Sequence, residues 1–185
     1  MDELRKAIKK VQDKERYEHT LGVAYTAASL AVLNDIDPKK ALVAGLLHDC
    51  AKCISPQDKI ALCKMYGVDV TPIEKRNPSL LHAKLGAKLA KEKYNEKDVD
   101  ILNAIENHTT GRPNMSVLEK IIFIADYIEP SRNKAPNLMQ IRKMAYNDID
   151  TALIKILQDT LDYLEQTGNE IDPGTKKTLD FYLKM

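Results

Sequence analysis

A nearly apolar segment of this chain contains one adjacent pair of polar side chains, His48 and Asp49. The segment runs from Ala44 to Lys52 and reads AGLLHDCAK. An imidazole and a carboxylate are costly to bury without a partner, and a metal ion is the commonest compensation at such a position. The pair therefore constrains the fold, because the helix that carries it must lie inside the protein. We expect His48 and Asp49 at the centre of a metal site.

The spacing of apolar residues favours helix in almost every part of the chain. β-branched alternation is scarce, and the 185 residues include only seven glycines, so helix is the expected state. This length suits one well-packed domain and is short for two. We predict an all-α helical bundle that forms a single domain over residues 1–185.

Apolar periodicity and capping residues define the expected helices. Two polar stretches, 67–77 and 129–136, are predicted to be connections, because prolines there discourage helix at the preceding residue. The predicted helices cover residues 2–13, 15–33, 38–50, 56–66, a segment starting at 79, 96–107, 117–128, 149–166 and 173–183.

The charge composition argues against a nucleic-acid-binding surface. The chain has 28 Lys and Arg against 27 Asp and Glu, which gives a net charge of +1 and no global basic field. No apolar run approaches the roughly 20 residues that a membrane span needs. Three cysteines, an odd number, without a recognisable secretory leader suggest a reducing compartment. We expect a soluble cytoplasmic protein with neither a nucleic-acid nor a membrane partner.

All four histidines and two aspartates stand where metal ligands could be expected. His19 lies near the start of one predicted helix, His82 lies within another, and His108 lies near the end of a third. Asp126 interrupts an apolar run, where an unpaired carboxylate would cost several kcal/mol. Helical bundles build dinuclear sites from such ligands on different helices, and nitrogen with oxygen ligands suits iron, manganese, cobalt or zinc. The candidate ligands are His19, His48, Asp49, His82, His108 and Asp126.

Each candidate ligand has a structural alternative when it is taken singly. His19 and His108 could be surface or capping histidines at helix ends. His82 could be a hydrogen-bonded structural histidine, and Asp126 could form an ion pair in the core. The order of all six residues along one chain favours the metal site.

This order resembles the metal-dependent phosphohydrolases of the HD superfamily, in the variant with two additional histidines for a second metal. Longer strings resemble one bacterial subfamily, the YqeK-type symmetrical bis(5'-nucleosyl)-tetraphosphatases, over almost the whole chain. A His-Asp pair alone is unspecific, whereas HTTG together with IEPSR is specific. The strings are RYEH at residues 16–19, LLHDCAK at 46–52, HTTG at 108–111 and ADYIEPSR at 125–132.

The resemblance implies an HD-domain bundle with a buried dinuclear site, and it divides the ligands between two divalent or trivalent ions. Asp49 would bridge the two ions, and iron is the metal implied by similar enzymes, with manganese, cobalt or zinc as alternatives. The first ion would be held by His19, His48, Asp49 and Asp126. The second ion would be held by Asp49, His82 and His108.

Cationic side chains beyond the ligands are also needed, because substrate phosphates carry more negative charge than two metals offset. We predict that Lys52 and Arg132 bind phosphate and take part in catalysis alongside Asp49. Arg112 is a weaker candidate, since most of the 28 Lys and Arg residues lie on the surface. Arg16 could contact the nucleotide or pair with a carboxylate near the metals. Further substrate contacts are predicted for Thr109, Thr110 and Gly111, although the threonines could simply end a helix.

Cys50 and Cys53 form a C-x-x-C pair without a second pair elsewhere, and Cys63 is ten residues further on. We therefore expect ordinary free thiols in place of a zinc or redox site. Tyr127, beside Asp126, could stack on a base, but an aromatic residue in the core is the expected role.

The resemblance implies symmetrical hydrolysis of diadenosine tetraphosphate, or of a related dinucleoside polyphosphate, to two nucleoside diphosphates. Two cations about 3.5 to 4 Å apart would activate a water molecule and neutralise the phosphoryl oxygens. Two alternatives stay open: another HD-type nucleotidase or cyclic-nucleotide phosphodiesterase, and a nucleotide-binding regulatory module with structural metals. A nucleotide or dinucleoside polyphosphate is the expected partner, and a homodimer is a further expectation.

Overall fold

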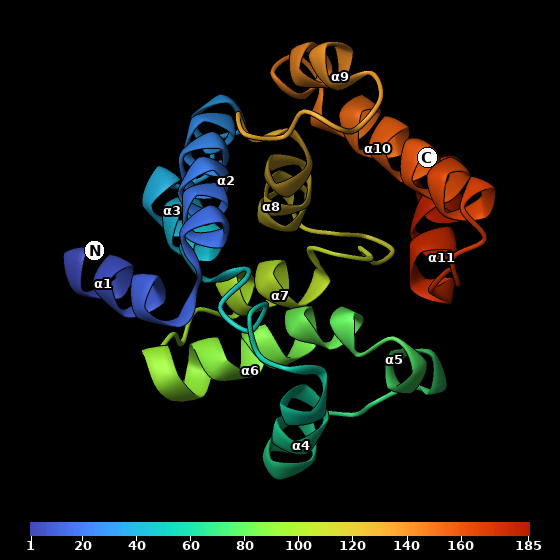
Figure 1. Ribbon diagram of the computed structural model, residues 1–185. Coiled ribbons are helices and arrows are strands. Elements are labelled where there is room, and N and C mark those ends of the chain that lie inside the picture. The colour runs from blue at the N-terminus through green and yellow to red at the C-terminus, as the bar shows by residue number, and fades with distance from the viewer.

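The computed structural model describes residues 1–185 and is built from helices, with no strand (Figure 1). The prediction of an all-α fold is therefore confirmed. None of the helices combines the length and the apolar character needed to cross a membrane. The elements are α1 (Asp2–Val11), α2 (Lys14–Leu33), α3 (Pro38–Leu47), α4 (Pro56–Tyr66), α5 (Pro72–Arg76), the 3-10 turn η1 (Pro78–Leu80), α6 (Leu81–Tyr94), α7 (Val99–Asn107), α8 (Val117–Ile128), α9 (Leu138–Ala145), α10 (Ile149–Gln166) and α11 (Pro173–Tyr182).

Most helices begin at a polar side chain that accepts a hydrogen bond from a backbone N–H two or three residues later. Such caps satisfy donors that have no partner within the helix, and they fix where each helix starts. The capping side chains include those of Asp13, Asp37, Ser55, Thr71, Asp98, Ser116, Asp148 and Asp172.

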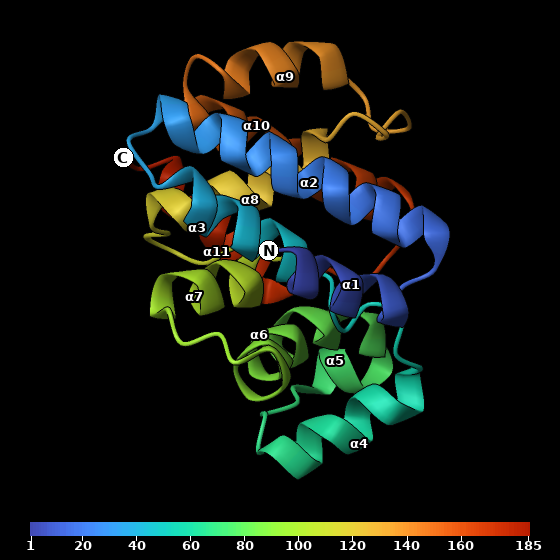
Figure 2. The same cartoon turned by 90° about the vertical axis from the view of Figure 1, so that its left-hand side faces the viewer.

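Helices α2 and α3 form the most extensive helix pair of the fold. A Cβ atom on Gly45 of α3 would lie 2.6 Å from the Cα atom of Ala24 on α2, so only glycine permits this close approach. Helix α8 packs against α2 on one side and against α10 on the other, while α7 packs against both α6 and α8 (Figure 1). Figure 2 shows α4 and α5 at one end of the molecule and α9 at the other.

A single hydrophobic cluster of 37 buried residues runs through these helices. Ile121, Ile122 and Ile124 of α8 are fully buried, which places this helix in the middle of the bundle. The N-terminal half of α2, the end of α3, the start of α6, the end of α7 and the second half of α8 converge on one region of the core. All of the candidate metal ligands lie there.

Three local predictions were wrong. Helix α3 ends at Leu47 instead of residue 50, because the chain tightens into turns in which the amides of Cys50 and Lys52 bond to carbonyl oxygens three residues earlier. The stretch predicted as a connection over 67–77 contains α5, which starts with a full capping box between Thr71 and Glu74. Helix α9 was not predicted.

Candidate metal centre

The four histidine rings form a row in the core. Ring centroids lie 5.4 Å apart for His19 and His48, 5.0 Å for His48 and His108, and 5.0 Å for His108 and His82. The rings come from α2, the end of α3, the end of α7 and the start of α6, and none is more than 6% exposed. The sequence therefore brings together four imidazoles that are far apart along the chain.

Asp49 lies against this row of rings. One of its carboxylate oxygens faces His19 and His48, and the other faces His82 and His108. Its Oδ2 atom is 3.4 Å from Nε2 of His48 and 3.8 Å from Nε2 of His19. Its Oδ1 atom is 3.4 Å from Nε2 of His82 and 3.7 Å from Nε2 of His108. All four Nε2 atoms thus point toward one carboxylate that is only 2% exposed.

The opposite nitrogen of three rings explains why Nε2 points inward. In each case the Nδ1–H donates to the backbone carbonyl oxygen three residues earlier, which fixes the ring and leaves the Nε2 lone pair free. These Nδ1 to oxygen distances are 2.7 Å for His48 with Gly45, 2.5 Å for His82 with Ser79 and 2.7 Å for His108 with Ile105.

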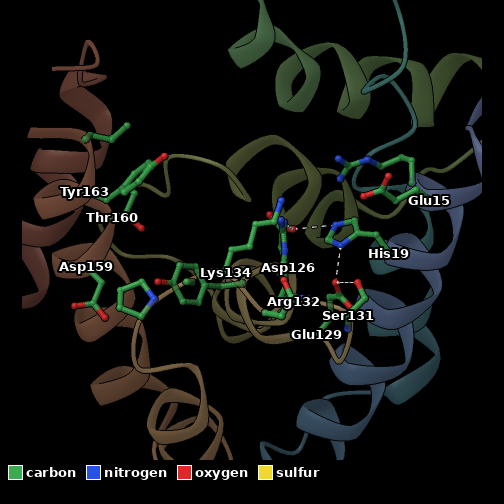
Figure 3. A pocket seen from close by; sticks show the side chains of 16 residues that line it. Glu15, His19, Asp126, Glu129, Ser131, Arg132, Lys134, Asp159, Thr160 and Tyr163 are labelled. Carbon is green, nitrogen blue, oxygen red and sulfur yellow. Dashed lines mark hydrogen bonds and ion pairs between the residues drawn. The ribbon is translucent and has the colours of Figure 1, made fainter. Parts of the chain in front are cut away.

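His19 is held differently, by the carboxylate of Glu129. The Nδ1 atom of His19 lies 3.0 Å from Oε1 of Glu129, which is 1% exposed (Figure 3). The backbone N–H of Ser131 donates to Glu129 at 2.7 Å, and the Ser131 hydroxyl donates to it as well. Burial raises the pKa of Glu129, but the hydrogen bonds from Ser131 and His19 outweigh burial and keep the pKa below its ordinary value. Sequence reasoning gave Glu129 no role, although it belongs to the IEPSR string.

Asp126 reaches the His19 end of the row from α8. Its Oδ1 atom lies 3.1 Å from Nε2 of His19 and 2.7 Å from Nη2 of Arg132. Arg132 also donates from Nε to the backbone oxygen of Asp126 at 2.9 Å. Burial raises the pKa of Asp126, but the contact with His19 and the positive charge of Arg132 outweigh it and hold the pKa well below its usual range. Asp126 is therefore ionised at neutral pH.

The pKa shifts of Asp49 and His82 also suit a metal. Burial raises the pKa of Asp49, but the surrounding histidines outweigh it and hold the pKa well below its usual range. The pKa of His82 lies well below its usual range, because burial, then His108 and Lys52, disfavour its charged form. Ionised carboxylates and neutral imidazoles are the forms that coordinate divalent cations.

Buried polar atoms without a partner provide the test of whether a metal fits. His19 Nε2, His48 Nε2 and Asp49 Oδ1 are buried and make no hydrogen bond, which is rare in folded proteins. Ligand atoms from two trios lie within 4.8 Å of one another, namely His19 with His48 and Asp126, and His48 with Asp49 and His108. A cation near each trio would satisfy the orphaned atoms, so the buried group could bind divalent metal.

His82 belongs to neither trio but lies next to the second one. Its Nε2 atom is 3.1 Å from Nε2 of His108 and 3.4 Å from Oδ1 of Asp49. Neighbouring ligand atoms around a metal with bonds of about 2.1 Å are about 3 Å apart. The separations therefore match those expected among ligands of one ion.

Three predicted substrate contacts lie beside the row. The Nζ atom of Lys52 is 3.2 Å from Nε2 of His82 and has no carboxylate partner. Arg16 Nη1 is 2.8 Å from Oδ2 of Asp49, so Arg16 pairs with a candidate ligand. Thr109 Oγ1 lies 3.2 Å from Nε2 of His82.

Other candidates face elsewhere. Arg112 forms a two-pronged ion pair with Glu119, at 2.6 and 2.8 Å, and is committed to that buried carboxylate. Thr110 and Gly111 contact α11, where the Thr178 hydroxyl donates to the Thr110 carbonyl at 3.2 Å. Gly111 has a φ of +65°, as expected of a glycine that ends a helix. A substrate contact by Thr110 or Gly111 stays a prediction.

None of the three cysteines forms a disulfide. Cys50 is buried and donates to the Gly86 carbonyl oxygen at 3.4 Å, whereas Cys53 is exposed and contacts Asp13. Burial, followed by the nearby charge of Asp49, raises the pKa of Cys50 to about 12. Such a thiol is unreactive at neutral pH.

A pocket of about 570 Å³ opens beside His19 and Asp126 (Figure 3). It lies between the start of α2, the segment 131–136 and α10, and it is called the α10 pocket below. Lys134, Thr160 and Tyr163 line it, and sequence reasoning gave none of them a role. Thr160 and Tyr163 belong to an amphipathic helix that carries no recognisable motif, so no sequence signal linked them to the histidines.

Comparisons with known proteins agree with these features. The family model described as HD domain matches residues 16–131. The symmetrical bis(5'-nucleosyl)-tetraphosphatase of Bacillus subtilis is 37% identical over 174 residues, which cover 94% of this chain and 92% of that protein. The enzyme of the same name from Halalkalibacterium halodurans is 41% identical over 165 residues, which cover 89% and 87% of the two chains.

A solved structure has nearly the same fold. It is a crystal structure from Clostridium acetobutylicum, described as a predicted HD superfamily hydrolase involved in NAD metabolism. Its TM-score is 0.95 at 39% sequence identity, and the superposition covers 99% of this chain and 96% of that chain.

Proposed function

The chain belongs to the HD domain family, and we propose that it hydrolyses diadenosine tetraphosphate symmetrically to two molecules of ADP. The observation that carries this proposal is the arrangement of four histidine Nε2 atoms around the two oxygens of Asp49. Relatives that share most of the chain's length are symmetrical tetraphosphatases by name.

In this proposal the buried group holds two metal ions. Asp49 would contribute to holding both, since its Oδ2 faces His19 and His48 while its Oδ1 faces His82 and His108. Asp126 completes the first set. Iron is the proposed metal, and the same nitrogen and oxygen donors would also accept manganese, cobalt or zinc.

Two bound metal ions would supply an activated water molecule and neutralise charge on the phosphoryl oxygens. The protein's own residues bind and orient the phosphate chain. Lys52 lies beside His82 without a carboxylate partner, so its charge is available to a phosphate. Arg132 lies at the other end of the row, beside Asp126, and retains unpaired N–H groups. Lys52 and Arg132 thus lie at opposite ends of the row of histidines. This placement favours a substrate with several phosphates that extends along the row.

Arg16 and Gln12 are proposed to position Asp49 and so keep its two oxygens facing the two pairs of histidines. Arg16 pairs with Oδ2 at 2.8 Å, and Gln12 donates from Nε2 to the Asp49 backbone oxygen at 3.1 Å. His48, Asp49, His82 and His108 are each no more than 3% exposed, so this part of the row has little contact with bulk water. In that setting each charge acts more strongly on the substrate than it would in water.

Three further expectations stay predictions. The proposed compartment is the cytoplasm, which the three free thiols support. The single domain over residues 1–185 can be tested by the cooperativity of unfolding. The homodimer can be tested by light scattering on the full chain.

Product analysis tests the proposed activity. Metal-loaded protein is incubated separately with diadenosine tetraphosphate, NAD, a 5'-mononucleotide and a cyclic nucleotide, and products are separated by ion-exchange chromatography. The proposal requires ADP as the sole product from diadenosine tetraphosphate. ATP plus AMP, or turnover of only the other substrates, would overturn it in favour of another nucleotide hydrolase.

Asp49→Ala separates an enzyme from a regulatory module. The enzyme proposal expects loss of turnover together with loss of at least one metal ion per chain. A module with structural metals would retain its nucleotide binding and most of its metal. Circular dichroism checks that the variant is folded.

A further inference from the structure

The α10 pocket adjoins the metal centre but contains groups that metal binding does not need. At one end lie His19 and Asp126, and at the other lie Thr160 and Tyr163 of α10. Figure 3 shows Lys134 and Arg132 between these two ends. The pocket thus leads from the metal centre, past two cations, to an aromatic ring.

The cations of the pocket are available to a ligand. Lys134 makes no ion pair and no side-chain hydrogen bond, and the Arg132 side chain is 42% exposed with its contacts confined to Asp126. The lining carboxylate of Asp159 is engaged by Lys155 at 2.7 Å. The lining carboxylate of Glu129 is buried and bonded to His19 and Ser131. Glu15 makes no ion pair, and it lies on α2, across the pocket from α10.

Tyr163 offers a free aromatic face. It is 59% exposed, and its hydroxyl has no hydrogen-bond partner. Aromatic side chains bind nucleic-acid bases by stacking, which tolerates different bases because every base has a π-face. The volume of about 570 Å³ lies within the usual range for small-ligand sites, about 300 to 1,000 Å³.

We infer that the α10 pocket binds one nucleoside diphosphate half of the substrate, with its phosphates at Arg132 and Lys134 and its base against Tyr163. This inference rests on the proposed function. The other half of the substrate extends past His82 and Lys52, at the opposite end of the row. Because the two halves of the substrate are identical, either half can enter the pocket, and one recognition site is enough.

The test uses steady-state kinetics of the full-length, metal-loaded protein with diadenosine tetraphosphate, and ADP as a competitive inhibitor. Tyr163→Ala and Lys134→Ala should each raise KM and the inhibition constant of ADP by about tenfold, with kcat within about twofold and unchanged metal content. Tyr163→Phe should retain the wild-type values, because it keeps the aromatic face.

Matched controls lie outside the pocket. Tyr146 and Lys143 are exposed residues at the end of α9 that do not line it, and Tyr146→Ala and Lys143→Ala should leave KM and ADP inhibition unchanged. Wild-type KM and ADP inhibition in both Tyr163→Ala and Lys134→Ala would overturn the inference. A wild-type protein that fails to cleave diadenosine tetraphosphate would instead count against the proposed function, so the two failures are distinguishable.

Discussion

Glu129 holds His19 in the orientation that directs its Nε2 atom into the core, through a 3.0 Å contact between Oε1 and Nδ1. The other three histidines use backbone carbonyl oxygens for the same purpose, so His19 alone has a charged partner. Space for this carboxylate comes from α2, since a Cβ atom on Gly22 would lie only 2.5 Å from Oε2 of Glu129. Gly22 therefore leaves the space that Glu129 occupies, and Glu129 in turn positions the candidate ligand His19.

Replacing Glu129 should weaken metal binding without unfolding the protein. A carboxylate that bonds a ligating histidine typically accounts for about 10- to 100-fold in metal affinity, and we expect a loss of that size in Glu129→Gln. Competition between the apo protein and a chromophoric chelator measures the affinity. Glu74→Gln is the matched control, because Glu74 is also a buried glutamate but pairs with Lys84 at 2.9 Å. Equal metal affinity in the Glu129 and Glu74 variants would contradict this role.

Lys52 should contribute to turnover and not to metal binding. Its ammonium group has no carboxylate partner beside His82, and removing one charged group that stabilises a transition state typically costs about 100-fold in kcat. We expect that loss in Lys52→Ala and partial recovery in Lys52→Arg, with metal content at the wild-type value in both. An unchanged kcat in Lys52→Ala would remove Lys52 from the mechanism.

Arg112 should matter for stability and not for activity. It neutralises Glu119, which is 1% exposed, so Arg112→Ala leaves a buried carboxylate without its cation. Because the arginine itself is partly exposed, we expect a decrease of about 1 to 3 kcal/mol in the free energy of unfolding. Urea denaturation measures this decrease, and kcat and KM of the folded variant should stay within about twofold of wild type. A large fall in kcat with an unchanged free energy of unfolding would contradict this role and indicate that Arg112 acts in catalysis.

Glu74 should make the stability of the apo protein depend on pH in the acid range. Burial raises its pKa, but hydrogen bonds from Lys84 and Thr71 outweigh burial and keep the pKa below its ordinary value. The folded state therefore binds fewer protons than the unfolded state, so this contribution is fully present above the ordinary glutamate pKa of about 4.3 and is lost as the pH falls through the lowered pKa of Glu74. Urea denaturation of apo wild type and Glu74→Gln across this range should show a smaller pH dependence in the variant. Parallel curves would contradict the assignment.

The helices that could be predicted well are those with both a cap and a regular apolar stripe. Helix α8 begins at Val117 after the Ser116 cap and ends at Ile128, as predicted, and α10 has its predicted limits. Helix α9 was missed although Leu138, Ile141 and Ala145 are buried at helical spacing. Its first residue follows Asn137, which has a φ of +58° and provides no side-chain cap, so the usual start signal is absent.

The site was predictable where chemistry requires rare residue types in apolar surroundings. His48 and Asp49 stand out for that reason, whereas Glu129 and Gln12 do not, because glutamate and glutamine are common at helix ends and on surfaces. Tyr163 and Lys134 reach the α10 pocket only through the packing of α10 against α8 and the path of the loop after α8. Spacing along the chain contains no information about that path.

Hydrolysis of diadenosine tetraphosphate in water enriched with oxygen-18 tests the central claim most directly. Attack by a water molecule on one β-phosphorus of the central anhydride predicts ADP as the only nucleotide product. In each turnover one of the two ADP molecules carries a single label, on its terminal phosphate, and the other leaves unlabelled. Mass spectrometry of the intact products and of their fragments reads both results. ATP and AMP as products, or a label on the α-phosphate, would contradict symmetrical cleavage at this site.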